Sequence, residues 1–490
     1  MRERGAFAIR ALVVSVAVTL CAAGVYKVIV PKYLATEDNS TSAFTAFYEL
    51  EEDSVDVLIL GSSHARESVI PQELYDEYGI TSYNLSSSQQ SMFLSYYWLK
   101  EALQTQSPRV VVLDTLMLWE NVSGPLGTTE GCVRRAMDYM RWDSVKLEAV
   151  LDICERDEDQ TLASYLLPNV RYHSRWEDEL ETEDFLSDSI INSSELMGFA
   201  AMYDYSGNDL EYSPLVAGSS DMVSDINEVM YEYLERIVDL CAENDIELVL
   251  IKTPTTSETM ARYNAMVQFA EEHGVVFYDM NEVSIYEAAG IDFNADFVDY
   301  GHANLNGALK VTAWLGELLS TEYGLEAHVN ATWEDSRGTY ECMVADYWLA
   351  AETDLDAYLT VLVENANRYT IFIAVQGSSL DGLSDSELDL LAALGLSAEG
   401  LGEIGTSYCA VVEAGSVLYE RTSEDSLSRT GSSLDGQLLY RIASDGSEDG
   451  SCSIKLDGSQ EAIQSDGLNI VVYDNARRYV VDSACFESAE

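Results

Sequence analysis

Two serines and a histidine directly follow an apolar run near the start of the chain, in "VDVLILGSSHARESVI" (55–70). Ser62 and Ser63 stand where a buried strand would end, so either one could cap the next helix or act as a nucleophile. A serine hydroxyl attacks an ester efficiently when a general base takes its proton and an acid orients that base. The histidines and carboxylates of the chain therefore decide between the two interpretations.

Among the five histidines, His302 is the candidate base. It stands in "DFVDYGHANLNGALK" (296–310), three residues after Asp299 and just before an amphipathic segment at 305–319. If this loop winds like a first helical turn, the Asp299 carboxylate can hold the Nδ1 proton and leave Nε2 free to accept the serine proton. The alternative is that Asp299 caps the helix and His302 packs beside it. The D-x-x-H spacing alone does not choose.

Four further residues are expected to play supporting roles. His64 should point away around the turn and cap or rim the site, and His273 precedes a glycine that suits a helix C-terminus. Asp114, at the end of a strand, is expected to fix a loop as a hydrogen-bond acceptor. Lys252, at the end of another strand, could steady an anionic or hydroxyl-bearing substrate, although a lysine there is more often plain surface.

The acidic composition narrows the classes of function. The 490 residues allow two or three domains. With 85 Asp and Glu against 27 Lys and Arg, the net charge of −58 excludes a nucleic-acid partner and argues against adhesion to anionic lipids. The eight cysteines lie far apart without a C-x-x-C or Cys/His cluster, so a zinc site is not expected. No metal or cofactor is assigned, although calcium binding by an acidic loop without EF-hand spacing stays open. The four after residue 340 could form disulfides in an oxidising compartment.

The first 34 residues, "MRERGAFAIRALVVSVAVTLCAAGVYKVIVPKYL", predict the compartment. With Lys27 snorkelling, residues 11–31 approach the ~20 residues of a membrane span. The positive-inside rule then places residues 1–10 in the cytoplasm and the bulk of the chain outside the cell membrane, after a stalk at 32–54. We expect an uncleaved signal anchor. A cleaved signal peptide, with "CAA" at the cleavage site, is the alternative.

Strand-like and helix-like stretches alternate in the region that follows. This alternation predicts a parallel sheet flanked by helices, with any ligand at the carboxyl ends of the strands. Residues 115–222 break the pattern and read as a long insertion, mostly helical. The predicted strands are 55–60, 81–85, 109–114, 246–253 and 275–280, and the predicted helices are 91–104, 223–244, 259–274 and 305–319.

The Gly-Ser-Ser turn near the start of this domain and the D-x-x-H near its end together resemble the SGNH (GDSL-like) hydrolase superfamily. The resemblance covers residues 55–335, with the insertion inside, and implies a flavodoxin-like three-layer α/β/α fold. It matches Ser63 to the family's nucleophile, with Ser62 in place of the usual aspartate, and Asp299 and His302 to its acid and base. The membrane-anchored surface branch, similar to DltD and alginate O-acetyltransferases, looks closest.

The chain departs from this family at the oxyanion hole. The family's G-x-N-D asparagine is replaced in "VVVLDTLMLWEN", where Leu116 is near its position, and the block-two glycine is replaced in "YNLSSSQQS" (83–91). Backbone N–H groups of Ser63 and of the Ser87–Gln89 loop, including Ser88, are the expected donors. The side chain of Gln89 or Asn84 could replace the missing amide, and the sequence does not choose between them.

The C-terminal region has a different character. Residues 369–396 predict a strand, a Gly-Ser turn and a short helix that starts near Ser384, where Glu387 completes a capping box. Hairpins are predicted at 406–421 and 467–486, with loops around short strands between 422 and 466. The ordered segments resemble the ILEI-like (interleukin-like EMT inducer) domain over 352–490, which implies a compact β-rich α+β module. A carbohydrate-binding role and a purely structural one both stay open.

With the predicted membrane anchor, the resemblance implies a cell-surface serine O-acyltransferase or esterase that acts on an envelope glycan or polysaccharide through an acyl-serine intermediate. The resemblance also implies a membrane-bound O-acyltransferase as a partner. The alternative is a catalytically inactive glycan-binding or assembly protein on the same fold. A secreted signalling protein, suggested by the last domain, is disfavoured by the predicted membrane anchor.

Overall fold

A computed structural model shows two compact units, Met1–Tyr340 and Glu341–Glu490. It describes residues 2–29, 40–119, 124–167, 169–177, 180, 182–185, 196–202, 207–377, 382–401 and 403–487. The border between the units falls inside helix α15 (Ala331–Ala351), so the residues between the two predicted domains are helical.

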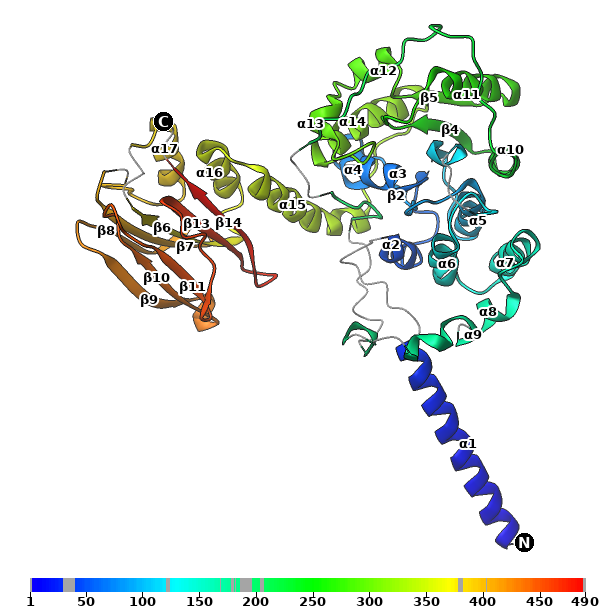
Figure 1. Ribbon diagram of the computed structural model, residues 1–490, viewed down its shortest axis with the longest axis horizontal. Helices are drawn as coiled ribbons and strands as arrows, with labels where there is room; N and C mark the ends of the chain where they lie inside the picture. Colours follow the sequence, from blue (N-terminus) through cyan, green and yellow to red (C-terminus); the bar gives the residue numbers. More distant parts are fainter. Residues whose placement is uncertain are drawn as a thin grey trace. The chain divides into compact units, whose positions relative to one another are not determined.

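A five-stranded parallel sheet organises the first unit (Figure 1). The order β2-β1-β3-β4-β5 is that of flavodoxin-like sheets. All five predicted strands are confirmed to within two residues. They are β1 (Val57–Leu60), β2 (Ser82–Asn84), β3 (Val110–Asp114), β4 (Glu247–Lys252) and β5 (Val276–Asp279).

Helices cover this sheet on both faces. Leu58 and Leu60 of β1 belong to an apolar cluster with Trp98 of α5 (Met92–Ala102) and Tyr233 of α10 (Glu228–Glu243). Val57 and Ile59, which alternate with these leucines along β1, are also fully buried, as strands covered on both sides require. The other helices of this framework are α3 (Ser63–Ser68), α4 (Pro71–Tyr78), α11 (Met260–His273), α12 (Val283–Ala288), α13 (Phe293–Asp296) and α14 (Leu305–Glu322).

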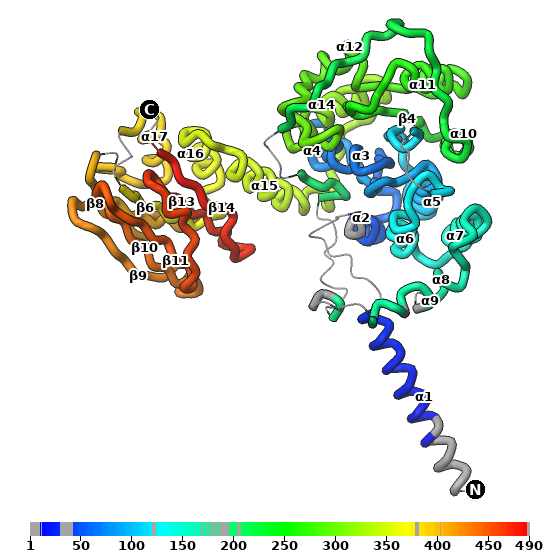
Figure 2. The backbone as a smooth tube through the Cα atoms, in the orientation of Figure 1, coloured from blue at the N-terminus to red at the C-terminus, as the bar shows by residue number. Residues whose placement is uncertain are grey.

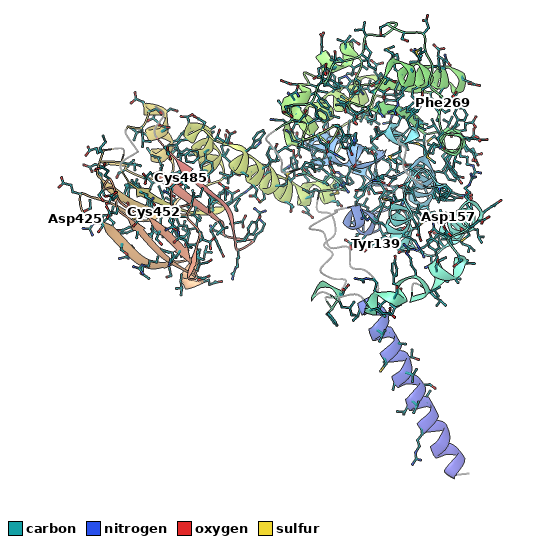
Figure 3. The ribbon with its side chains drawn as sticks, in the orientation of Figure 1. Tyr139, Asp157, Phe269, Asp425, Cys452 and Cys485 are labelled. Carbon is teal, nitrogen blue, oxygen red and sulfur yellow. The ribbon has the colours of Figure 1, made fainter. Side chains whose placement is uncertain are left out.

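The predicted helices are confirmed, with two boundaries shifted: α14 ends three residues later than expected, at Glu322, and α10 differs at its start. Helix α10 begins five residues later than expected, because the Asn227 side chain accepts hydrogen bonds from the backbone of Val229 and Met230 and so caps the helix there. Helix α11 ends at Gly274 in the left-handed conformation, as predicted. His273 stacks on Phe269, with ring centroids 4.2 Å apart; Figure 3 labels Phe269 on α11.

The described part of the insertion is built of short helices. These are α6 (Glu130–Tyr139), α7 (Ser144–Arg156), α8 (Leu162–Leu166), α9 (Asn169–Tyr172) and the 3-10 turns η1 (Leu116–Leu118), η2 (His173–Glu177) and η3 (Thr182–Phe185). Buried residues of α6 and α7, such as Val133 and Ile153, join the apolar cluster of α5 and α10. The insertion therefore extends the core of this unit.

Residues 32–39 of the predicted stalk lie outside the described residues, and the next eight residues differ from a stalk. Residues 40–47 form α2 (Ser40–Phe47), and the side chains of Phe44 and Phe47 are buried in the core of the first unit. Phe44 stacks on Trp98 with a centroid distance of 4.3 Å. An aromatic pair spaced three residues apart lies on one helical face, and that face packs onto the domain instead of linking to it.

The N-terminal helix α1 (Arg2–Ile29) contains one segment, Leu12–Ile29, that is long and apolar enough to cross a membrane. The same length and composition also suit a signal sequence, so both alternatives from the sequence remain.

The second unit contains two antiparallel sheets. The larger has the order β14-β13-β6-β7-β8, and helices α16 (Leu355–Glu364) and α17 (Asp385–Ala393) pack on it. The capping box of Ser384 with Glu387 and both predicted hairpins are confirmed. The strands are β6 (Tyr369–Gln376), β7 (Ser407–Glu413), β8 (Ser416–Ser423), β13 (Gly467–Asp474) and β14 (Tyr479–Phe486).

The region 422–466 is more regular than expected. It forms a four-stranded sheet of β9 (Leu427–Ser433), β10 (Leu438–Ser444), β11 (Ser453–Leu456) and β12 (Ser459–Gln460). Leu438, Tyr440 and Ile442 alternate inward to meet Phe372 of the larger sheet, so a period of two was present beneath the Ser/Gly-rich composition. Cys452 and Cys485, labelled in Figure 3, are free thiols in the structure, as are Cys342 and Cys409.

Candidate active site

The turn between β1 and α3 presents Ser63 at the first position of the helix. Ser62 is the N-cap residue, and its Oγ accepts a hydrogen bond of 3.3 Å from the backbone N–H of His64. Gly61 leaves room for the close approach of β3, because a Cβ at this position would lie 2.7 Å from Cβ of Asp114. The capping role and the candidate nucleophile thus belong to different serines, since Ser62 caps α3 and the half-buried Ser63 faces the loop before α14.

That loop returns from far along the chain to lie beside α3. Figure 2 shows the blue segment that carries Ser63 close to the green segment leading into α14, and α3 and α14 are in contact. The Asn304 side chain caps α14 by accepting from the N–H of Gly307. Tyr300 is bonded to the loop after β4, since its carbonyl accepts hydrogen bonds from Thr255 Oγ1 at 2.8 Å and from the N–H of Thr256 at 3.0 Å.

Three predicted site residues come together in one hydrogen-bonded line. Ser63 Oγ lies 2.8 Å from Nε2 of His302, and Nδ1 of His302 lies 2.8 Å from Oδ2 and 3.0 Å from Oδ1 of Asp299. This is the order of atoms that lets an imidazole pass a proton between a hydroxyl and a reacting group while a carboxylate holds the ring.

The Asp299 carboxylate is prepared for that position by its own loop. Burial acts to raise its pKa, but hydrogen bonds from the His302 ring and from the backbone N–H groups of His302 and Gly301 outweigh burial. The pKa of Asp299 therefore lies below its ordinary value. Both backbone bonds end on Oδ1 at 3.0 Å. The two backbone hydrogen bonds thus fix the conformation of the loop and also favour the ionised carboxylate beside the imidazole.

The sequence predicts that His64 points away from the site, but the structure places it against His302. Its ring is buried and lies edge to face against the ring of His302, at a centroid distance of 4.7 Å. Burial, His302 and Lys252 hold the pKa of His64 well below its ordinary value, so this imidazole is neutral. His64 therefore forms a buried, uncharged wall behind His302.

Asn84 is placed differently from the expectation that its amide could face the nucleophile. The residue is fully buried, and Nδ2 donates to the carbonyls of Ala65 at 2.9 Å and Val69 at 3.0 Å. These bonds use both amide hydrogens to hold α3 against β2.

Ser88 and Gln89 lie in the loop after β2, beside the nucleophile turn. The neighbouring Ser87 donates its backbone N–H to the carbonyl of Gly61 at 3.2 Å, which fixes the loop against the end of β1. Ser88 Oγ accepts a long bond of 3.4 Å from Arg66. Gln89 is exposed, and its side-chain oxygen lies 3.7 Å from Sγ of Cys132 on α6. The loop backbone, more than these side chains, is the part held next to Ser63.

Asp114 and Lys252, at the ends of β3 and β4, are both buried, and the sequence predicts the role of only the first. Asp114 fixes a turn as expected, since its Oδ2 accepts a hydrogen bond of 3.2 Å from Ser62 Oγ. Lys252 is not a surface residue, because only 1% of its side chain is exposed. Among the described residues, no group of three or more His, Cys, Asp or Glu is placed to hold a metal ion.

Comparisons with known proteins add little to this geometry. No family model matches the chain, and no curated protein matches it. Among solved structures, a GDSL-like lipase from Bacteroides thetaiotaomicron is similar, with 11% sequence identity and a TM-score of 0.26. The match covers 58% of this chain and 100% of the lipase. A TM-score this low carries no argument, so any functional conclusion rests on the arrangement of Ser63, His302 and Asp299.

Proposed function

We propose that this protein is an SGNH-type serine esterase or O-acyltransferase that works through an acyl-serine intermediate. Ser63 is the nucleophile, His302 the general base and acid, and Asp299 the residue that orients His302. One observation carries this proposal: Oγ of Ser63 and the carboxylate of Asp299 lie on opposite ring nitrogens of His302, each at 2.8 Å.

The reaction follows from that line of atoms. As Ser63 Oγ attacks the acyl carbonyl carbon, its proton passes to Nε2 of His302, and the carbonyl oxygen becomes an oxyanion. Collapse of the tetrahedral intermediate expels the alcohol, which takes the proton from Nε2, and leaves the acyl group on Ser63. Water or a sugar hydroxyl then attacks the acyl carbon and gives its proton to Nε2. The second collapse returns that proton to Oγ and releases an acid or a new ester.

The oxyanion has to be stabilised by backbone donors in this proposal. The N–H of Ser63 belongs to the first residue of α3, a position without an intrahelical acceptor. The loop of residues 87–89 is held beside it through the bond of Ser87 to Gly61. The loss of one oxyanion donor costs about 2.7–4 kcal/mol of transition-state stabilisation, so these backbone groups determine how fast the enzyme can be.

The setting of the reaction is part of the proposal. A helix suited to span a membrane precedes the catalytic unit, which supports a location on the outer face of the cell membrane. A hydroxyl-rich envelope glycan is the acceptor or substrate that such a location offers. A membrane-bound O-acyltransferase that delivers the acyl group is the partner this arrangement would need if the protein is a transferase.

The second candidate function is an inactive glycan-binding or assembly protein. It is favoured by the commitment of the Asn84 amide to α3 and by the leucine near the position of the family's oxyanion asparagine. It predicts that the triad geometry persists without turnover.

Fluorophosphonate labelling of the full-length protein in detergent separates these functions. The wild type is expected to be labelled and to hydrolyse an aryl acetate, and Ser63→Ala to lose both activities. Ser62→Ala is the matched control variant. It removes the side-chain cap of α3 but keeps Ser63, so it should still be labelled. A wild type that resists the probe and leaves aryl acetates intact would exclude the enzymatic proposal. If labelling is lost in Ser62→Ala but not in Ser63→Ala, the nucleophile is Ser62 and the assignment of Ser63 is wrong.

A partition experiment then separates esterase from transferase. Aryl acetate is supplied with increasing concentrations of a neutral oligosaccharide, and both acetate and acetylated sugar are measured. With a transferase, acetylated sugar should replace acetate as the sugar concentration rises, and the two products together should equal the aryl alcohol released. An esterase yields acetate at every sugar concentration.

A further inference from the structure

A layer of buried polar side chains lies at the carboxyl ends of the strands, beneath the triad. Ser62 follows β1, Asp114 ends β3, Lys252 ends β4 and Asp279 ends β5. Asp114, Lys252 and Asp279 are each only about 1% exposed, and in the β4–β5 pairing Lys252 lies directly opposite Asp279. Such burial is rare for charged groups unless they are paired.

Lys252 supplies the positive charge in this layer. Its Nζ lies 3.5 Å from Oε2 of Glu258, whose side chain is 3% exposed. Because the lysine itself is shielded from solvent, its ammonium group is not positioned to contact a substrate. The suggestion that Lys252 steadies an anionic substrate therefore does not fit the structure.

Three carboxylates share this one cation. Asp114 and Lys252 end the paired strands β3 and β4, and Asp114 lies opposite Ile251, the residue before Lys252. Burial raises the pKa of Asp114, and the charge of Lys252 is the largest influence that opposes the increase. Burial and the neighbouring Glu258 raise the pKa of Asp279 to about 7, again against the pull of Asn281 and Lys252. The positive charge of Lys252 also contributes to the lowered pKa of His64 on α3.

A short chain of hydrogen bonds connects this charge to the nucleophile. The Ser62 hydroxyl donates a hydrogen bond of 3.2 Å to Oδ2 of Asp114, and Ser62 Oγ in turn accepts a hydrogen bond of 3.3 Å from the backbone N–H of His64. Ser63 lies between these two residues in the first turn of α3. A charged acceptor holds such a hydroxyl more strongly than a neutral one.

We propose that Lys252 is a positioning residue for Ser63. Its ammonium group keeps the buried Asp114 carboxylate ionised, and this carboxylate fixes Ser62 and thereby the turn that presents the nucleophile to His302. The inference rests on the proposed role of Ser63 and assigns to Lys252 no contact with substrate.

A double-mutant cycle tests this chain of action. The second-order rate constant of fluorophosphonate labelling is measured against pH for the full-length wild type, Lys252→Met, Asp114→Asn and the double variant. Misplacement of a reacting atom by about 1 Å can cost about 10²-fold, so we expect Lys252→Met to lower the rate by about 10–100-fold. The loss should deepen as the pH falls, because without Lys252 the Asp114 carboxylate is protonated more readily.

In the Asp114→Asn background, Lys252→Met should cause little further loss, because the side chain through which Lys252 acts no longer titrates. Losses that multiply independently in the double variant would overturn the proposal, as would an unchanged rate and pH profile for Lys252→Met. The matched control is Lys146→Met, which removes a lysine that is 3% exposed and bonded to the carbonyls of Met140 and Asp138 in the insertion. It should keep the wild-type pH profile.

Two further measurements keep the test decisive. If Lys252→Met does not fold, Lys252→Met with Glu258→Gln removes both partners of the ion pair and should fold, yet still show the slower, pH-dependent labelling. If the wild type is not labelled, the proposed function fails, and thermal unfolding against pH tests the layer alone. Lys252→Met should then be most destabilised at high pH, and Asp114→Asn should partly restore it. An absence of restoration would show that Lys252 does not act on Asp114.

Discussion

The imidazole rings of His64 and His302 meet edge to face, with centroids 4.7 Å apart and an interplanar angle of 67°. One ring follows the nucleophile and the other comes from the loop before α14. Gly301 makes this contact possible, because a Cβ there would lie 2.1 Å from Cε1 of His64. The glycine of "DYGH" is thus a packing requirement set by the histidine of "GSSH".

Gly301→Ala should therefore slow labelling of Ser63 through a clash with His64. The added methyl group must displace either the His64 ring or the loop that carries His302, and we expect a loss of about 10–100-fold. In a His64→Ala background the methyl group enters vacated space, so the same substitution should cost much less. The measurement is the labelling rate constant across the four members of the cycle.

Gly338→Ala is the control for this cycle, since a Cβ at that position meets nothing within 4 Å. It should leave the rate unchanged. Equal losses from Gly301→Ala in both backgrounds would mean that His64 is not what the methyl group meets.

Asp299→Asn should lower labelling and ester hydrolysis by about 10²–10⁴-fold. An amide can still accept the two backbone N–H bonds, so the loop should persist, but its NH₂ group can face Nδ1 and favour the tautomer with the proton on Nε2. That tautomer cannot take the Ser63 proton. Asp292→Asn, an exposed acid that caps α13 in the same segment, should remain active. A fully active Asp299→Asn would remove Asp299 from the mechanism.

The framework of the first unit could be predicted because its signals are local and repeated. Continuous apolar runs such as 109–114 have few alternatives to a strand covered on both faces. The stalk was a wrong assignment at residues 40–47, since the apolar face formed by Phe44 and Phe47 is too short to stand out from a linker. The sheet of residues 427–460 was missed because its alternation is diluted by serine and glycine.

The site was predictable where the chemistry itself restricts the residue type. Only one histidine had an acid three residues before it and a helix after it, so Ser63, His302 and Asp299 could be named together. Burial is what the sequence does not display. His64 and Lys252 were expected at the rim or surface, and the structure buries both. His64 meets the distant Gly301, and Lys252 ends β4, which lies between β3 and β5.

Asn84→Ala should reduce stability far more than activity. The substitution leaves the carbonyls of Ala65 and Val69 without the amide donor, at a cost of about 1–3 kcal/mol for each buried group left unpaired. Well below the melting temperature, the labelling rate of the folded protein should fall less than about tenfold.

A loss of about 10²–10³-fold without destabilisation would instead point to an oxyanion role for Asn84. Asn264→Ala is the matched control, because Asn264 Nδ2 also donates to two carbonyls, of Ser220 and Met222, at a less buried place. It should be destabilised less than Asn84→Ala.

Asp279→Asn should change how the stability of the first unit depends on pH. Burial and Glu258 raise the pKa of Asp279 to about 7 in the folded protein, whereas an unfolded chain returns it to about 4. The folded state thus holds the proton more tightly, so the stability contributed at low pH is lost as the pH rises from about 4 to about 7. The asparagine does not titrate, and its Oδ1 can still accept the two bonds from Asn281.

The melting temperature of Asp279→Asn relative to wild type should therefore increase from pH 4 to pH 7 and then level off. Glu258→Gln offers an internal check, because removing the neighbouring charge lowers the pKa of Asp279 and moves the upper end of this window to lower pH. A difference between Asp279→Asn and wild type that is constant from pH 4 to pH 8 would mean that Asp279 is ionised throughout. In that case the positive charge of Lys252 would be sufficient to keep Asp279 ionised even at pH 4.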